Sequence, residues 1–182
     1  MGKPAAVFSR LVSRDAAITA ALTLPEKGRT WRTLALLVAH SGDSPVWAAI
    51  FAAVWFLGDP RWRAIVILAV AGMVSIEIVV IIVKLFVKRL RPAGTFGAIY
   101  RKTDPYSFPS GHAARAAMLI ILSGLYCPSL IFAGILLWSP VMILSRIAIG
   151  IHYVLDIIGG LLLGTGLTFA VIQVVQYVVS RL

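Results

Sequence analysis

Six ionisable side chains lie at or near the ends of apolar segments, and their types suit the handling of a phosphate group. In chain order they are Lys84, Arg91, His112, Arg146, His152 and Asp156. An ionisable residue in or beside a long apolar run is costly in lipid, so it is a candidate for function. Cations can neutralise phosphate oxygens, and two histidines at one site can divide the work of nucleophile and general acid.

Two pairs of these residues have helical spacing. Lys84 and Arg91 are seven residues apart, about two helical turns, so they would project from nearly the same face. Asp156 follows His152 by four residues, so we expect these side chains to share a helix face and to hydrogen-bond. Each pair also has a simpler interpretation. Lys84 and Arg91 could snorkel to lipid headgroups, and Asp156 could stabilise a helix start.

Ser110 and Gly111 directly precede His112, at the point where an apolar segment begins. We expect a helix N-terminus here, and its free backbone N–H groups together with the Ser110 hydroxyl would form an anion site. Glycine allows the backbone to approach a phosphate closely. The sequence therefore adds neutral hydrogen-bond donors to the charged candidates.

The composition predicts a membrane protein. The 182 residues are enough for one domain, and we predict a single membrane-embedded domain over residues 1–182. Hydrophobic residues make up 60% and charged residues 13%, whereas soluble domains have about 45–50% and about 25%. The formal net charge of +10 fits anionic headgroups or a phosphorylated substrate better than nucleic acid, because several basic residues lie beside or inside apolar runs.

The apolar segments predict an all-α fold, a polytopic transmembrane helix bundle of about five spans, with six as the alternative. The expected spans are residues 45–57, 62–87, 111–126, 129–149 and 152–179. Residues 1–32 mix charged and apolar side chains, which predicts an amphipathic segment in the membrane interface, broken near residues 25–28. A short helix is expected over residues 31–40. The polar loop over residues 88–110 is long enough to suggest a function.

Antiparallel spans would place all the functional residues on one membrane face. The second expected span ends and the third begins at that face, on either side of the polar loop. The fourth ends and the fifth begins there as well. One pocket can therefore collect side chains that are far apart in the sequence.

This ordered set of residues resembles the signature of the type 2 phosphatidic acid phosphatase (PAP2) superfamily, in its membrane lipid phosphatase branch. The signature has three parts: Lys84 with six residues before Arg91-Pro92, then Pro109-Ser110-Gly111-His112, then Ser145-Arg146 with five residues before His152 and three more before Asp156. All signature positions hold the expected residues.

The resemblance implies a role for each of these residues. His152 would attack phosphorus and carry the phosphoryl group as phosphohistidine. Asp156 would hold the imidazole in its reactive tautomer, and His112 would protonate the leaving oxygen and later activate water. The remaining signature residues would bind the phosphate: Lys84, Arg91, Ser110, Gly111 and Arg146.

The resemblance also implies the substrate class and the surroundings. Family members hydrolyse lipid phosphates such as phosphatidic acid, phosphatidylglycerol phosphate and polyprenyl diphosphates, and they need no metal or other cofactor. The implied partners are a lipid phosphate substrate and membrane lipids, without nucleic acid, and the oligomeric state does not follow. The chain is similar in size to bacterial members, which implies the bacterial inner membrane. Those members commonly have six spans and a site outside the cytoplasm. Here, basic residues are in excess on the side of the site, which instead predicts that the site faces the cytoplasm.

Four more charged residues lie in or near these segments. Glu77 is mid-span, where we expect it to pair with an interior polar group, although it could also support Lys84 or line the substrate entrance. Arg115 could reach the pocket, pair with Glu77 or snorkel. We expect His40 to be solvated or to cap a helix, and Asp104 to face water or headgroups.

Three other functions are compatible with parts of this pattern. A non-catalytic lipid-binding protein could retain the pocket, although the complete set of His112, His152 and Asp156 argues against a degenerate site. Vanadium haloperoxidases share the pocket residues, but they are soluble and larger. A channel or transporter would need polar residues along several spans, and only Glu77 is clearly mid-span.

Overall fold

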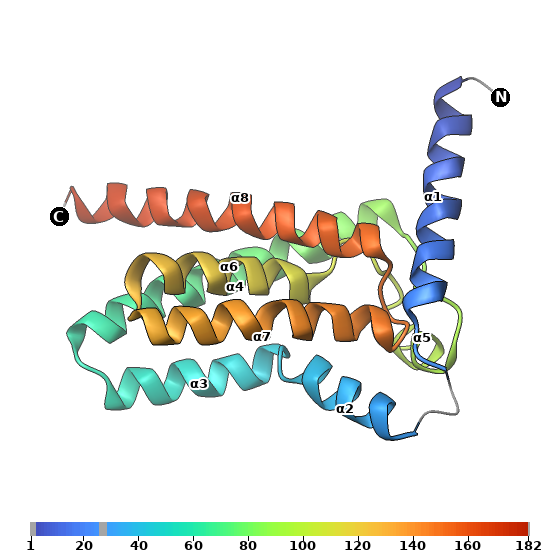
Figure 1. The fold of residues 1–182 in the computed structure, drawn as a ribbon. Helices are drawn as coiled ribbons and strands as arrows, with labels where there is room; N and C mark the ends of the chain where they lie inside the picture. The colour runs from blue at the N-terminus through green and yellow to red at the C-terminus, as the bar shows by residue number, and fades with distance from the viewer. Residues whose placement is uncertain (1–2, 26–28, 182) are drawn as a thin grey trace.

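The computed structural model describes residues 3–25 and 29–181, and this part of the chain is built from helices. The helices are α1 (Lys3–Leu22), α2 (Arg29–His40), α3 (Ser44–Leu57), α4 (Pro60–Val87), α5 (Thr95–Tyr100), α6 (Gly111–Tyr126), α7 (Ser129–Ala148) and α8 (Val154–Val179). Five of them, α3, α4, α6, α7 and α8, run roughly along one axis and form a bundle (Figure 1). The predicted all-α transmembrane bundle is confirmed.

The spans differ in detail from the five expected ones. Within the described residues, α4, α7 and α8 are long and apolar enough to cross a membrane. A fourth span is possible if α2 and α3 are counted together, because they form a pair bent by 50° at a short break. The segment expected over residues 45–57 is therefore the second half of a broken element. The break at residues 41–43 forms a turn between α2 and α3.

Helix α6 is short but lies in the middle of the bundle. Its 16 residues span about 24 Å, and most of its side chains between Ala113 and Leu122 are buried. Glycines of α8 allow the close approach, because a Cβ at Gly160 would lie 2.3 Å from the Ser110 carbonyl oxygen and one at Gly164 would lie 2.2 Å from that of Ala114. This packing of small residues is typical of helices that associate in membranes.

The outer faces of the bundle are apolar. Large side chains such as Phe86, Leu137 and Leu162 are more than two-thirds exposed. A soluble protein rarely exposes apolar surface on this scale, and lipid is the solvent that suits it.

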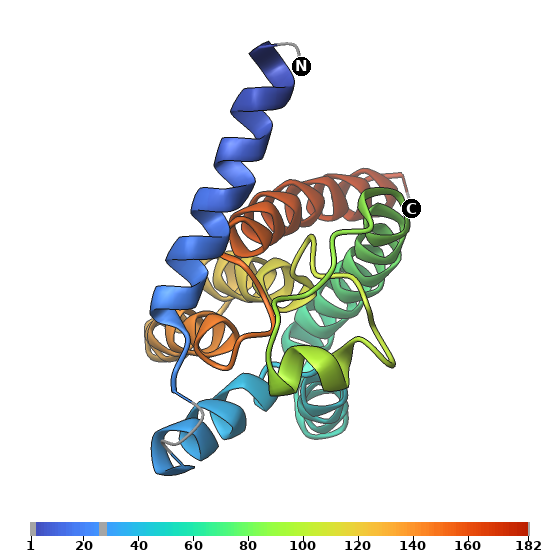
Figure 2. The same ribbon diagram turned by 90° about the vertical axis from the view of Figure 1, so that its right-hand side faces the viewer.

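Helix α1 lies outside the bundle and at a steep angle to it (Figures 1 and 2). It contacts α7 and α8, and its Asp15 and Thr19 are buried there. The placement of residues 1–32 in the membrane interface stays a prediction. The break expected near residues 25–28 falls mostly on residues outside the described ranges.

The end of the bundle nearest α1 is where the chain turns between its functional segments. Lys88 ends α4 in a left-handed conformation with φ of 50°, and the following loop carries α5 across this end (Figure 2). Gly150, with φ of 75°, makes the tight turn between α7 and His152, a conformation that glycine adopts without steric cost. The end of α4, the start of α6, the end of α7 and the start of α8 therefore meet here.

Candidate active site

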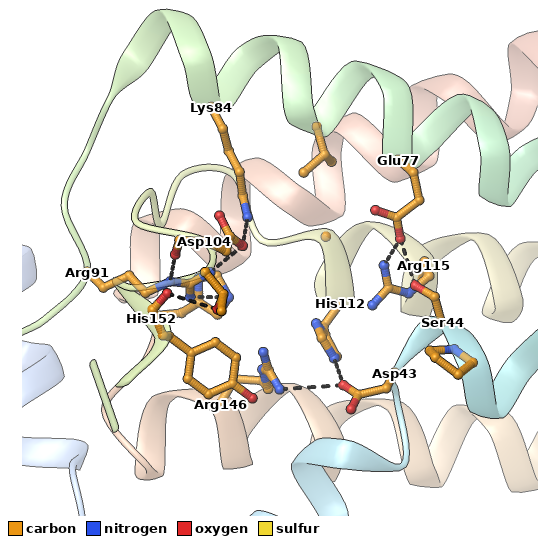
Figure 3. Close-up of a pocket in the computed structure, with 15 residues that line it drawn as sticks. Asp43, Ser44, Glu77, Lys84, Arg91, Asp104, His112, Arg115, Arg146 and His152 are labelled. Atoms are coloured by element: carbon orange, nitrogen blue, oxygen red, sulfur yellow. Dashed lines mark hydrogen bonds and ion pairs between the residues drawn. The ribbon is translucent and has the colours of Figure 1, made fainter. Parts of the chain in front are cut away.

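A cavity of about 310 Å³ opens at this end of the bundle (Figure 3). Six of the eight predicted site residues line it: Lys84, Arg91, Gly111, His112, Arg146 and His152. The other two lie behind the wall, because Ser110 and Asp156 are fully buried and contact residues that reach the cavity. The structure therefore brings together all the side chains that the sequence placed at one membrane face.

His152 lies in the wall with 2% of its surface exposed. The Nη1 of Arg91 is 3.3 Å from its Nε2. A guanidinium can only donate hydrogen bonds, so Nε2 is the unprotonated nitrogen and the ring proton is on Nδ1. Burial and then the positive charges of Arg91 and Arg146 hold the pKa of His152 well below its ordinary value. The imidazole is therefore neutral at pH 7, with its lone pair at the cavity.

Asp156 does not hydrogen-bond to His152 as the spacing predicts. The distance from His152 Nδ1 to Asp156 Oδ2 is 3.6 Å, and Nδ1 has no hydrogen-bond partner among the described residues. The prediction assumed one helix through both residues, but α8 begins at Val154. Asp156 is consequently the third helical residue, and its Oδ2 accepts from the backbone N–H of Tyr153 at 2.8 Å.

A chain of charges leads from Asp156 to the N-terminal helix. Arg89 donates from Nη1 to Asp156 Oδ1 at 2.8 Å and from Nη2 to Asp15 Oδ2 at 2.6 Å. Asp15 also accepts from the backbone N–H of Leu155 at 3.1 Å. Helix α1 is thereby fixed to the start of α8, next to His152. Neither Asp15 nor Arg89 was predicted as a site residue, because the two are 74 residues apart in the sequence.

His112 is held by a carboxylate on the opposite side of the cavity. Its Nε2 lies 2.8 Å from Oδ1 of Asp43, in the break between α2 and α3. The other oxygen, Oδ2, is 2.7 Å from Nδ1 of His40. His40 is half exposed, which agrees with the solvated alternative expected for it, and it contacts this turn only through the Asp43 side chain. Asp43 itself was not predicted as a site residue.

Asp104 corrects one expectation, because it faces the cavity and not only water. Its carboxylate pairs with Lys84, and its Oδ2 accepts from Arg91 Nη2 at 2.6 Å. Burial raises the pKa of Asp104, but the hydrogen bonds and charges of Lys84 and Arg91 outweigh this and lower it overall. The loop thus places an anionic group between two of the three predicted phosphate-binding cations.

Arg146 is the cation with the fewest partners. It is 2% exposed, and its Nε and Nη1 have no hydrogen-bond partner among the described residues. Its Nη1 is 3.9 Å from Asp43 Oδ1, and its guanidinium lies 5.5 Å from the centre of the Tyr100 ring. The side chain also hydrogen-bonds to Tyr100. Buried donors without partners are costly, so Nε and Nη1 are suited to bind an anion from the cavity.

Ser110 caps α6, because its hydroxyl accepts from the backbone N–H of Ala113 at 3.4 Å. Its own backbone N–H donates to the Asp156 carbonyl at 2.9 Å, so that group is already used. The predicted anion site at the start of α6 is thus reduced to Gly111, which lines the cavity together with His112.

The far part of the cavity holds a second polar cluster. Arg115 pairs with Glu77, which was one of the expected alternatives for each residue. The Nη2 of Arg115 also donates to the Gly42 carbonyl at 3.1 Å. The hydroxyl of Ser44 donates to Glu77 Oε1 at 2.9 Å. All three side chains line the same cavity as the histidines. In residues 3–25 and 29–181, no three His, Cys, Asp or Glu side chains form a group that could hold a metal ion.

The comparison with known families decides the membership. The PAP2 superfamily model matches residues 60–180. The chain belongs to the PAP2 superfamily. A decaprenylphosphoryl-5-phosphoribose phosphatase of Mycobacterium tuberculosis is 31% identical over 128 residues, covering 70% of this chain and 71% of that protein. An undecaprenyl-diphosphatase of Sulfolobus acidocaldarius is 27% identical over 148 residues, covering 80% and 71%.

Solved structures of the superfamily have the same fold. The transmembrane PAP2-type phosphatidylglycerolphosphate phosphatase of Bacillus subtilis superposes with a TM-score of 0.71 at 21% identity, covering 92% of this chain and 87% of that one. LpxE of Aquifex aeolicus gives 0.69 at 19% identity, with 86% and 93% covered. The chain is therefore an integral membrane protein of this superfamily.

Proposed function

We propose that this PAP2 protein is a lipid phosphatase that works through a phosphohistidine on His152. One observation carries the proposal: a neutral imidazole presents its Nε2 lone pair to a cavity that is lined by Lys84, Arg91 and Arg146. Three cations around a nucleophile match the charge of a phosphate, and arginine binds phosphate in a bidentate manner. The carboxylate of Asp104 marks a position that a phosphate oxygen would take.

In the first step, Nε2 of His152 attacks phosphorus and the bond from phosphorus to the ester oxygen breaks. Arg91 moves from Nε2 to the phosphate oxygens, which are the stronger acceptors. The leaving oxygen takes the Nε2 proton of His112, which enters this step as an imidazolium favoured by the bound phosphate dianion, and the leaving oxygen replaces Asp43 as the acceptor. The ring becomes positively charged with its proton on Nδ1, and the Asp156 carboxylate 3.6 Å from Nδ1 stabilises that charge.

In the second step, water attacks the phosphohistidine. His112 now takes a proton from the water, the bond between phosphorus and nitrogen breaks, and inorganic phosphate leaves. Lys84, Arg91 and Arg146 stabilise the charge on the equatorial oxygens in both steps. These side chains supply the positive charge, and we propose that no metal or other cofactor takes part.

The location of the cavity supports a lipid substrate. It lies at one end of the membrane-crossing helices, and its wall includes Pro45 and Val80 on the side of α3 and α4. A lipid could present its headgroup there while its tails remain in the bilayer. The relatives described above are named for lipid-linked phosphate substrates, decaprenylphosphoryl-5-phosphoribose and undecaprenyl diphosphate.

Phosphate release from purified protein tests the proposal. We expect release from lipid monophosphates or diphosphates in detergent, unaffected by a chelator, and a loss of at least about 10³-fold in His152→Ala. Asp59→Asn is the control, because Asp59 caps α4 at the other end of the bundle. Equal release by the wild type and His152→Ala would refute the mechanism, and no release from any lipid would support a lipid-binding protein.

We also propose that the protein lies in a bacterial plasma membrane with its site toward the cytoplasm, following the excess of basic residues on that side. Lys102 is exposed in the loop over the cavity. A Lys102→Cys variant in a background with Cys127→Ala should resist a membrane-impermeant thiol reagent in intact cells and react in opened membranes. Strong labelling of intact cells would place the site outside.

A further inference from the structure

The cavity has a second half that the proposed mechanism does not use. Glu77, Arg115 and Ser44 lie together on one side of it, across His112 from the cluster of Lys84, Arg91 and His152 (Figure 3). We propose that this half binds a hydroxylated leaving group, so that the preferred substrate is a lipid whose terminal phosphate is esterified to a polyol or sugar. This inference rests on the proposed function and names the substrate class of the same site.

The cavity is larger than a phosphoryl group requires. Each water-sized atom needs about 10–15 Å³ of cavity volume, so the four oxygens of a phosphate need roughly 40–60 Å³. The cavity measures about 310 Å³. More than half of it therefore remains for the part of the substrate next to the scissile bond.

The charges of the two halves differ. Around His152, three cations face one carboxylate, which leaves an excess positive charge for one phosphate. In the other half Arg115 is paired with Glu77, and the Asp43 carboxylate between the halves is taken up by His112 and His40 and lies 3.9 Å from Arg146. Among the described residues that line the cavity, no unpaired cation remains there for a second phosphate. A diphosphate would place its second phosphate beside Glu77 without a free cation to balance its charge.

The polar groups of this half are arranged to accept hydrogen bonds. Both Ser44 and Arg115 donate to Oε1 of Glu77, and no described residue donates to its Oε2. About a third of the Glu77 side chain is exposed. A hydroxyl group is a donor that suits a carboxylate oxygen, and it can also accept from Ser44 after a rotation of the serine hydroxyl. Several neighbouring hydroxyls, as on glycerol or a sugar, would use these groups together.

The position of Glu77 along α4 agrees with a hydroxylated group that lies next to the phosphate. Glu77 precedes Lys84 by seven residues, about 10 Å nearer the middle of the bundle. A substrate with its phosphate at Lys84 would thus place its leaving group at Glu77. Its lipid tail would leave between α3 and α4, past Pro45 and Val80. The hydroxylated part would be the link between phosphate and tail.

Three substrates separate the possibilities. Phosphatidylglycerol phosphate has a glycerol hydroxyl next to its terminal phosphate and has its second phosphate beyond that glycerol. Phosphatidic acid has no free hydroxyl there, and farnesyl diphosphate has its second phosphate directly attached to the first. We expect kcat/KM for phosphatidylglycerol phosphate to exceed that for farnesyl diphosphate by at least about 10-fold. In Ser44→Ala and Glu77→Gln, the preference for phosphatidylglycerol phosphate over phosphatidic acid should fall by about 3- to 10-fold, as for the loss of one hydrogen bond.

Two controls keep the test sharp. Ser44→Ala leaves the pair of Glu77 and Arg115 in place, so it tests the subsite even if Glu77→Gln fails to fold. Ser75 lies on α4, the helix of Glu77, but its hydroxyl donates to the Ala71 carbonyl and does not line the cavity. Ser75→Ala should therefore keep the preference. Turnover that depends on His152 but favours the diphosphate, or a preference that Ser44→Ala leaves unchanged, would overturn the inference alone. Absence of turnover with all three lipids would overturn the proposed function, and the inference with it.

Discussion

His112 and His152 face the same cavity, but the chain supports them in different ways. A carboxylate hydrogen-bonds directly to His112, and that carboxylate comes from the turn between α2 and α3. His152 has a carboxylate 3.6 Å away, and this group is held by a backbone N–H and by Arg89. Cations, not anions, lie closest to the reactive nitrogen of His152.

The difference matches two chemical tasks. The Asp43 carboxylate can only accept hydrogen bonds, so it fixes a proton on Nε2 of His112, the atom that would donate to the leaving oxygen, and this suits a general acid. Burial among cations favours a neutral imidazole, which suits a nucleophile. The same residue type therefore serves two purposes because its surroundings differ, and the following substitutions should separate them.

The largest effect is expected for His112→Asn. Loss of the general acid and base should lower kcat by about 10²- to 10⁴-fold. Because the second step also needs this base, a good leaving group such as p-nitrophenol should restore the first step and not the second. The phosphorylated protein should then accumulate, which a pre-steady-state burst of p-nitrophenol with substrate in excess would show. A uniform loss for all leaving groups, without a burst, would contradict the assigned role.

Asp43→Asn should have the next largest effect. It removes a hydrogen bond between His112 and a charged group, and such bonds contribute about 1.5–3 kcal/mol, so kcat should fall by about 10- to 100-fold. The matched control is Asp59→Asn, which also changes a carboxylate in a turn before a helix but at the other end of the bundle. Equal activity of the two variants would show that Asp43 does not support catalysis.

A smaller effect, about 3- to 10-fold in kcat, is expected for Asp15→Asn and Arg89→Gln. These residues position Asp156 and do not reach the substrate. In Arg89→Gln the loss of a nearby positive charge should also raise the pKa of His152 and shift the acidic limb of the pH profile upward. A purely structural role would lower the thermal stability and leave that limb in place.

The pH profile of the wild type should show the depressed pKa of His152. An ordinary histidine titrates near pH 6.5, but burial and Arg91 keep His152 neutral at lower pH. The acidic limb of kcat/KM, corrected for the substrate's own ionisation near pH 6, should therefore lie below pH 6.5. Below that pH the unfolded chain binds a proton that the folded protein does not, so stability should fall as the pH falls. A limb at or above pH 6.5 would contradict the assignment.

Sequence spacing predicted the signature residues well because helix ends are fixed by local patterns. Five of them lie where apolar runs stop or start, and the packing of the helices brings these ends to one cavity: Lys84, Arg91, His112, Arg146 and His152. The helix-face argument for His152 and Asp156 was wrong because the helix starts two residues later than it required.

The residues that sequence reasoning missed lie in turns or pair over long separations. Asp43 and Asp104 come from a turn and a loop, whose course depends on tertiary contacts. Asp15 meets Arg89 only because α1 packs against the start of α8. The polar length of the loop over residues 88–110 did signal function, but it did not show which of its charges would turn inward.

Direct trapping of the phosphorylated protein is the closest test of the central claim. The protein would be mixed with a lipid substrate labelled in its terminal phosphate and quenched in alkali within milliseconds, since phosphohistidine survives base and not acid. We predict covalent label that acid removes, that maps to the peptide containing His152, and that is absent from His152→Ala. Label on another residue, or turnover by the wild type with no trapped label even in His112→Asn, would contradict the account.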